Sequence, residues 1–393
     1  MNRANGEDGA RRSEKAFVAA MVALGVFAPT VFMGLPAVVG QVAQHWAFGD
    51  ATLGVAVFVE VLGMSCGSLL VAFGLGRQPV RHVLLAAAVL AAGANLATPG
   101  VHGFVAFALW RWLAGIGAGA LNGIAMRYLS YTGTPERHLG MLVMGQVFWG
   151  MALLAVVIPW LGATWGAPGV FTFVAALSVP FACTAWQLGR DETLATPQQA
   201  MQGHVDKGGA LLSLVALFAL YGGVGVVWTF LEKIGADAGL SGGYISGVLA
   251  VANLVSLAAC VLMPRLGVGS GLRRWTLFNL AGCVLAAASL ALPPSPLSFA
   301  IGAVVFIVCW TGGALLIFAT IPQYDFVGRF AALSPGFLAL GFGVGSIAGG
   351  ELLEASGTRA ALEVAIALCV LAFVLYAKLR RLDDDAALVP TCE

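Results

Sequence analysis

The sequence predicts an all-α integral membrane protein with twelve transmembrane helices in two six-helix bundles. Three observations lead to this prediction: long uncharged stretches, a one-sided distribution of Lys and Arg, and one polar segment in the middle of the chain. Apolar residues make up 60% of the 393 residues and charged residues 10%, whereas soluble domains carry about 25% charged residues. Most of the surface is therefore expected to face lipid.

The uncharged stretches indicate helices. No Asp, Glu, Lys or Arg occurs in 16–49, 138–189 or 275–324, and the two longer stretches can each hold two spans of about 20 residues. Backbone polar groups in lipid must be paired within the protein, so only helices or a closed barrel cross a membrane. Barrel strands alternate over roughly ten residues, which these runs do not do.

Gly, Pro and charged residues divide the runs into twelve spans. The first span is too long for a signal-peptide core and follows a polar segment, so we expect it to be retained. In chain order the spans are 16–42, 51–76, 82–98, 103–126, 139–161, 169–188, 209–234, 243–264, 275–292, 297–321, 331–352 and 359–377.

The basic residues predict the orientation. With the N-terminus inside the cell, seventeen Lys and Arg residues fall in inner segments, only Lys233 and Arg359 fall outside, and Arg111 lies within a span. Basic residues gather in cytoplasmic loops. We therefore expect a multi-pass protein of the cell inner membrane with both termini cytoplasmic and with His45 and Trp46 outside.

The longest polar connection divides the chain into halves. It predicts an N-terminal tail, a first six-helix bundle, a cytoplasmic linker, a second six-helix bundle and a C-terminal tail. Their bounds are 1–15, 16–188, 189–208, 209–378 and 379–393.

Composition also excludes several functions. The five His residues are dispersed over span ends and loops, so no metal site is expected. No Walker lysine motif is present, so the driving force must come from gradients rather than ATP. No nucleophile, base and orienting group come together, which argues against an enzyme, and no cofactor is expected. The basic residues are explained by topology, so no nucleic-acid partner is expected.

Two ionisable residues fall deep inside predicted spans, where each costs several kcal/mol and indicates a functional role. At about 1.5 Å per residue, Glu60 lies about 14 Å deep in the second span and Arg111 about 12 Å deep in the fourth. At matching depths the two side chains can pair. The pair either fixes helix packing permanently, or takes part in proton coupling or substrate binding when protonation of Glu60 frees Arg111.

The chain resembles the major facilitator superfamily over essentially its whole length. The resemblance rests on the twelve spans, on the loop that divides them six and six, and on the fourth-span stretch from Arg111 to Gly119, in which Gly115 follows the Arg by four residues. Gly76 to Val80 resembles the tail of the family motif between spans two and three, without its acidic residue. The fifth-span Gly-Pro motif of proton-driven exporters is not recognisable. A narrower resemblance, to a bacterial subgroup, rests on an acidic span-two residue (Glu60) and a Trp-x-x-x-Glu motif in span seven (Trp228 and Glu232).

Two helix faces are candidates for a central cavity. Residues spaced 0, 4, 7 and 11 share one helix face, as do Arg111, Gly115, Ala118 and Asn122 in span four and Tyr221, Gly225, Trp228 and Glu232 in span seven. The resemblance implies that spans one, four, seven and ten line a cavity, and an aromatic and amide lining suits a mostly apolar or aromatic solute. Packing or anchoring is the other interpretation of each Trp and Tyr. The candidate lining residues are Asn122, Gln146, Trp149, Tyr221, Trp228, Trp310 and Thr311.

Glu232 lies near the outer end of span seven, beside Lys233. It is interpreted as a solvated rim charge or, alternatively, as part of an outer gate, because Gly222, Gly223 and Gly225 would let the outer half of the span bend.

Two glycine ladders, each with a four-residue repeat, predict close helix contacts that are either static or allow sliding. They are Gly115, Gly119 and Gly123 in span four, and Gly341, Gly345 and Gly349 in span eleven.

Together these features predict a monomeric secondary active transporter that moves a small organic solute by alternating access. Protons, or alternatively another coupling ion, are expected to drive transport, and export is the expected direction. Proton-coupled uptake of an organic, aromatic anion held by Arg111 is the alternative within transport. A membrane receptor or scaffold that does not transport is the alternative of another class.

Overall fold

The computed structural model describes residues 2–71, 78–130, 132, 135–184, 206–267, 271–292, 295–324, 330 and 333–379, with side chains from Lys15 onward except at 130, 135, 136, 183, 184 and 264. These residues are almost entirely helical, as predicted. The first half contains α1 (Asn2–Phe27), α2 (Thr30–Met33), α3 (Leu35–Trp46), α4 (Asp50–Leu69), α5 (Val80–Ala97), α6 (Phe104–Ser130), α7 (Pro135–Ala152) and α8 (Ile158–Thr184). The second half contains α9 (Lys207–Asp237), α10 (Gly242–Leu266), α11 (Gly271–Leu290), α12 (Pro296–Tyr324), α13 (Ser334–Ser356) and α14 (Thr358–Ala377).

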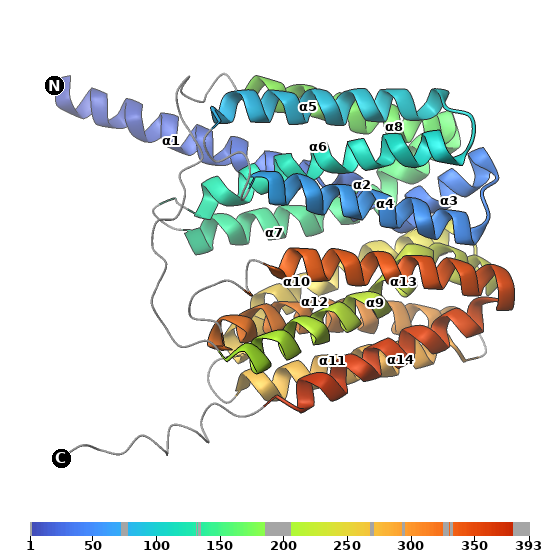
Figure 1. Cartoon of the computed structure of the whole chain (residues 1–393). Helices are drawn as coiled ribbons and strands as arrows, with labels where there is room; N and C mark the ends of the chain where they lie inside the picture. The colour runs from blue at the N-terminus through green and yellow to red at the C-terminus, as the bar shows by residue number, and fades with distance from the viewer. Residues whose placement is uncertain are drawn as a thin grey trace, which may run out of the picture.

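The helices form two bundles that lie side by side (Figure 1). Helices α1–α8 pack on one another through the pairs α4–α6, α5–α6, α5–α8 and α1–α7, and α9–α14 pack through α9–α13, α9–α14, α11–α12 and α10–α12. The first residues of α1 and the last residues of α14 lie at one end of the molecule, which we call the terminal end. The opposite end, where 47–49, 238–241 and 357 connect helices, is called the far end.

Nine helices of the described residues are long and apolar enough to cross a membrane. One of these segments, Arg137–Ala182, covers two predicted spans. Its two arms are separated at Gly166, whose φ of 64° and ψ of −161° interrupt α8 between the predicted spans 139–161 and 169–188. Glycine suits this backbone conformation because it lacks a Cβ. A π-helical turn, Leu153–Val157, joins α7 to α8.

The first span differs from the prediction of one continuous stretch. It is a series of three helices, α1, α2 and α3, interrupted at residues 28–29 and at Gly34. α1 also begins at Asn2, within the predicted N-terminal tail. The predicted linker 189–208 and tail 379–393 lie almost wholly outside the described residues, as do residues 72–77 of the motif-like connection after α4.

Large apolar side chains cover the outside of both bundles. Val105 is 82% exposed, Leu285 70% and Val89 68%, which is the surface expected of helices in lipid. α9 packs on α10, α12, α13 and α14 of its own bundle and on α3 of the other, and most of its residues are buried. Sequence hydrophobicity therefore serves lipid contact in the peripheral helices and core packing in α9.

The bundles touch along α4 and α13 at the far end. A Cβ added to Gly54 would overlap the carbonyl oxygen of Ser346, and one added to Gly350 would overlap that of Asp50. The N-terminus of α4 has no side-chain cap of its own. Instead, Glu354 of the other bundle accepts the Ala51 N–H at 3.0 Å, which supplies the cap.

A salt bridge across the same seam joins Lys233 of α9 to Asp50 of α4 at 3.6 Å. Lys233 also pairs with Asp237 one turn along its own helix, at 3.2 Å. Among the described residues, the far end is therefore closed by the close approach of the α4 and α13 backbones, by the Glu354 cap and by the Lys233–Asp50 ion pair.

Candidate functional site

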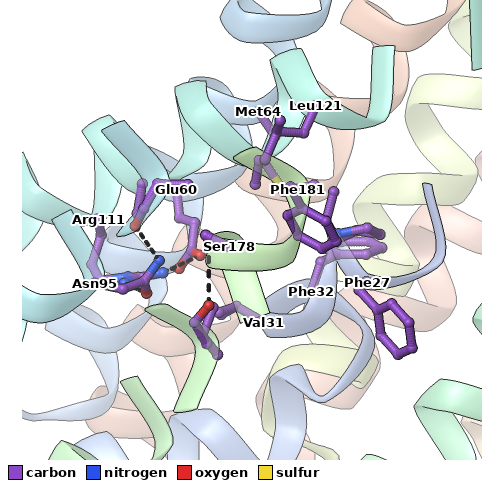
Figure 2. A pocket seen from close by; sticks show the side chains of 16 residues that line it. Phe27, Val31, Phe32, Glu60, Met64, Asn95, Arg111, Leu121, Ser178 and Phe181 are labelled. Atoms are coloured by element: carbon purple, nitrogen blue, oxygen red, sulfur yellow. Dashed lines mark hydrogen bonds and ion pairs between the residues drawn. The ribbon is translucent and has the colours of Figure 1, made fainter. Parts of the chain in front are cut away.

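The two intramembrane charges meet inside the first bundle. α4 carries Glu60 and packs on α6, which carries Arg111. The Arg111 Nε donates to Glu60 Oε2 at 3.1 Å, and its second terminal nitrogen contacts Oε1 in a two-pronged pair. Arg111 is 2% exposed and the Glu60 side chain 12%. The prediction of matched depth thus corresponds to a direct ion pair (Figure 2).

Two residues that the sequence analysis did not select complete the surroundings of Arg111. Asn95 of α5 accepts from Arg111 Nη1 at 2.8 Å, and its own amide donates to the Ala91 carbonyl at 2.8 Å. The guanidinium carbon lies 4.6 Å from the ring centroid of Phe171 in α8. Such a cation–π contact stabilises a charge more when it is desolvated. Arg111 therefore joins α6 to three other helices of its bundle.

A narrow cavity borders this pair. It reaches from the ion pair to the interruption in the first span. Polar partners and space for roughly one or two water molecules make a proton path to the Glu60 carboxylate physically feasible. Besides the ion pair and Asn95, its lining includes Phe27, Pro29, Phe32, Met64, Ser178 and Phe181.

Three of the predicted lining residues form one aromatic cluster in the second bundle. The ring of Trp310 lies 6.2 Å from that of Tyr221, edge to face, and 5.6 Å from that of Trp228. Trp228 also donates its indole N–H across the bundle interface to the Phe32 carbonyl, at 3.5 Å. The Thr311 hydroxyl donates to the Ile307 carbonyl of its own helix, so this group is already paired.

The predicted lining residues of span five lie elsewhere, against the interrupted first span. Gln146 donates to the Gly25 carbonyl at 2.9 Å, and Trp149 donates to the Thr30 hydroxyl at 3.0 Å. Both contacts stay within the first bundle. These side chains therefore fasten α7 to the first span and lie apart from the Trp310 cluster.

Asn122 is not brought to the aromatic cluster. Its amide nitrogen lies 3.8 Å from the Met126 sulfur on the same helix. Its buried side-chain oxygen has no hydrogen-bond partner among the described residues.

Glu232 lies at the bundle interface. It is only partly exposed, and a Cβ added to Gly40 of α3 would lie 2.9 Å from its Oε1. The exposed ion pairs at this level belong to Lys233 instead. Its position is thus that of a residue between α3 and α9, facing the first bundle.

The two glycine ladders pack within bundles. A Cβ at Gly115 or Gly119 would overlap the backbone oxygen of Glu60 or Met64 in α4. At Gly341 and Gly345 it would overlap backbone oxygens of α9, and Gly349 packs on Val226 of the same helix. Gly123 has ordinary room, with its nearest neighbour at 3.4 Å. The ladders therefore hold α6 on α4 and α13 on α9, whereas the seam between bundles uses other glycines.

Residues 16–331 match the family model of the Major Facilitator Superfamily, which is well over half of the chain. The chain belongs to the major facilitator superfamily. Members of this superfamily are membrane transporters, so the protein is a transporter and not an enzyme. No group of three or more His, Cys, Asp or Glu residues that could hold a metal ion occurs in the described part of this facilitator.

Solved structures of other facilitators share the fold. A nucleoside transporter, NupG, superposes with a TM-score of 0.69 at 14% identity, covering 93% of this chain and 99% of that one. A D-xylose-proton symporter superposes with a TM-score of 0.74 at 14% identity, covering 93% and 97%. At such identities the likeness concerns the fold alone. No curated protein matches the sequence.

Proposed function

We propose that this facilitator is a proton-coupled secondary transporter that exports a small, mostly uncharged organic solute across the cell inner membrane. The observation that carries the proposal is the Glu60–Arg111 pair, a buried carboxylate beside a narrow cavity. Protonation of Glu60 would cancel the charge that holds Arg111 in place. Binding and release of a proton would thereby change which helix contacts are favourable.

The surroundings of Arg111 favour this role over capture of an organic anion. Glu60, Asn95 and Phe171 already occupy the guanidinium, and 2% of the residue is exposed. An anion would have to displace a buried, two-pronged carboxylate. The aromatic cluster of Tyr221, Trp228 and Trp310 instead offers ring faces and few charges, which suits a ring-containing solute.

The orientation is part of the same proposal. The excess of Lys and Arg supports a cytoplasmic terminal end, and the far end, closed by α4 and α13, then faces outside. His45 is exposed at the far end and Lys207 is exposed at the terminal end. Trp46 is a poor reporter because it donates to the Val101 carbonyl. An impermeant thiol reagent added outside should label His45→Cys and not Lys207→Cys, and the reverse pattern would overturn the orientation.

Transport is tested in two steps. A thermal-shift screen of nucleosides, pentoses, and aromatic alcohols and amines on the purified protein identifies bound solutes. Labelled hits are then followed in vesicles. Inside-out vesicles with an acidic lumen should accumulate the solute if the protein exports it by proton exchange. Accumulation only in right-side-out vesicles with an acidic exterior would show uptake. Flux in neither would support the receptor or scaffold alternative.

A further inference from the structure

The interrupted first span contains two prolines, and each leaves one backbone carbonyl without its helical donor. In a helix the carbonyl of residue i accepts the N–H of residue i+4, and proline has no N–H. Pro29 therefore removes the i+4 donor of the Gly25 carbonyl, and Pro36 removes that of the Phe32 carbonyl. The Gly34 N–H is also directed toward the Phe32 carbonyl, but its hydrogen bond goes to the Thr30 carbonyl at 3.1 Å. The ladder otherwise continues across the break, since the Met33 N–H donates to the Pro29 carbonyl at 2.9 Å.

Side chains from other helices supply the two missing donors. The Gly25 carbonyl accepts from Gln146 of α7 at 2.9 Å, within the same bundle. The Phe32 carbonyl accepts from the indole nitrogen of Trp228 at 3.5 Å, and that residue belongs to α9 of the other bundle. The first bond persists however the bundles move as rigid bodies. The second exists only while α9 lies against the first span.

The segment around Phe32 is inserted against the second bundle. Its ring lies 5.2 Å from that of Phe342 in α13. The indole of Trp228 packs on Trp310 at 5.6 Å and is 3% exposed. The hydrogen bond of the Phe32 carbonyl is thus partly buried between the two bundles in this arrangement, and a buried carbonyl without a donor is costly.

We propose that Trp228 is a positioning residue for transport, which holds the far end closed by donating its indole N–H to the carbonyl that Pro36 leaves free. When the far end opens, α9 separates from α2 and α3 of the first span and the bond is lost. Pro36 leaves the Phe32 carbonyl available as an acceptor, and the Trp228 indole N–H donates to it. The proposal rests on the alternating movement of the function proposed above, but its test needs no solute.

The far-end separation is measured between spin labels on His45→Cys in α3 and Ala236→Cys in α9, both exposed, in a variant without the seven native cysteines. Trp228→Phe keeps an aromatic ring and removes the donor. One net hydrogen bond corresponds to roughly a tenfold change in an equilibrium constant, so Trp228→Phe should shift the distance distribution toward longer values. It should also lower the melting temperature, because the carbonyl is left unpaired.

Pro36→Ala separates the hydrogen bond from general packing. Alanine supplies a backbone N–H to the Phe32 carbonyl, so Pro36→Ala should also lengthen the distance while leaving the melting temperature at or above the wild-type value. The double variant should have a higher melting temperature than Trp228→Phe alone, because Pro36→Ala supplies the missing donor. Its far-end distance should be no longer than that of Trp228→Phe alone. This non-additivity is expected only of residues that share one interaction.

Gln146→Leu is the matched control, since it removes the donor of the other proline-freed carbonyl. It should lower the melting temperature without changing the far-end distance, because its bond lies within one bundle. The proposal is overturned if Trp228→Phe leaves the far-end distance unchanged, or if Pro36→Ala does not raise the melting temperature of the Trp228→Phe protein. It is also overturned if the distance shift of the double variant equals the sum of the shifts of the two single variants. An absence of solute flux, by contrast, would contradict only the proposed transport function.

Discussion

A buried arginine needs partners that water cannot supply, and Arg111 has them on three sides. An ion pair removed from water rarely stabilises a protein more than apolar side chains of the same volume. Packing alone therefore does not require the Glu60–Arg111 pair at this place. A carboxylate that can gain and lose a proton is the property that apolar residues cannot replace.

Replacing Glu60 by Gln is expected to abolish pH-driven transport and to lower stability together. Gln keeps a hydrogen-bond acceptor but leaves the Arg111 charge without a counter-charge, and breaking a buried pair in this way costs about 3–5 kcal/mol. Asn95 still holds one guanidinium nitrogen, so we expect the variant to insert and fold. Melting temperature and pH-driven flux are measured on the same preparation.

The double variant Glu60→Leu with Arg111→Met separates the two effects. It removes both charges, so most of the stability should return, whereas pH-driven flux should remain absent. A stable Glu60→Gln protein with unaltered pH-driven flux would remove Glu60 from the mechanism.

Asn95→Leu is expected to destabilise the first bundle by about 1–3 kcal/mol, the cost of leaving a buried donor of Arg111 unpaired. The loss should be smaller than that of Glu60→Gln, because the charge stays neutralised. Asn122→Leu is the matched control in the same bundle, since among the described residues the amide nitrogen has its contact at 3.8 Å with a sulfur. Thermal unfolding of both variants gives the comparison, and equal losses would contradict the assigned role of Asn95.

Sequence reasoning identified Glu60 and Arg111 because charge in a bilayer is conspicuous and depth follows from helical rise. It missed Asn95, although the signal existed: this is a lone amide in the otherwise apolar run after His82. It had no means to select Phe171, because the approach of a ring to a guanidinium depends on how α8 packs on α6.

At the scale of helices, the glycines of one ladder differ in how much space they leave for a side chain. Gly119→Ala is expected to destabilise the contact between α6 and α4 by about 1–3 kcal/mol, as overpacking does, because its Cβ would overlap the Met64 carbonyl. Gly119→Leu should disable transport while membrane insertion proceeds. Gly123→Ala is the control and should be nearly neutral, since its Cβ would have ordinary contacts. Unfolding temperature and flux are measured, and wild-type flux in Gly119→Leu would show that this rung is not a contact.

Helix breaks were the weak point of prediction at this scale. Hydropathy reads 16–42 as one span because apolar character does not change where the backbone is interrupted. Pro29, Gly34 and Pro36 are visible in the sequence, but proline is tolerated in membrane helices. Whether it breaks the helix depends on donors such as Gln146 and Trp228, which come from helices distant in the chain.

For the whole molecule, charge and hydropathy sufficed to predict an all-α membrane fold, because lipid leaves few alternatives to the backbone. The contacts between bundles were not predictable in the same way. Gly54 and Gly350 stand outside both ladders in the sequence, yet they line the seam between α4 and α13. Which glycine faces which helix is decided by the rotation of each helix within its bundle.

The closure of the far end should depend more on Glu354 than on Lys233. Glu354 caps the N-terminus of α4 from the other bundle, and loss of a cap costs about 0.5–2 kcal/mol. The side chains of Lys233 and Asp50 are 38% and 19% exposed, and an ion pair that solvent reaches contributes about 0–1 kcal/mol. Glu354→Ala should therefore lengthen the spin-label distance between positions 45 and 236 clearly, and Lys233→Met only slightly.

Arg359→Met is the control for this comparison. It breaks an exposed ion pair with Glu363 at the same end of the molecule, but both partners belong to α14. No contact between bundles is lost, so the distance should stay at its wild-type value. If Arg359→Met lengthens the distance as much as Glu354→Ala does, surface charge at the far end governs closure and the cap does not. If Lys233→Met has the larger effect, the ion pair is the stronger of the two links, and Asp50→Asn should then reproduce it.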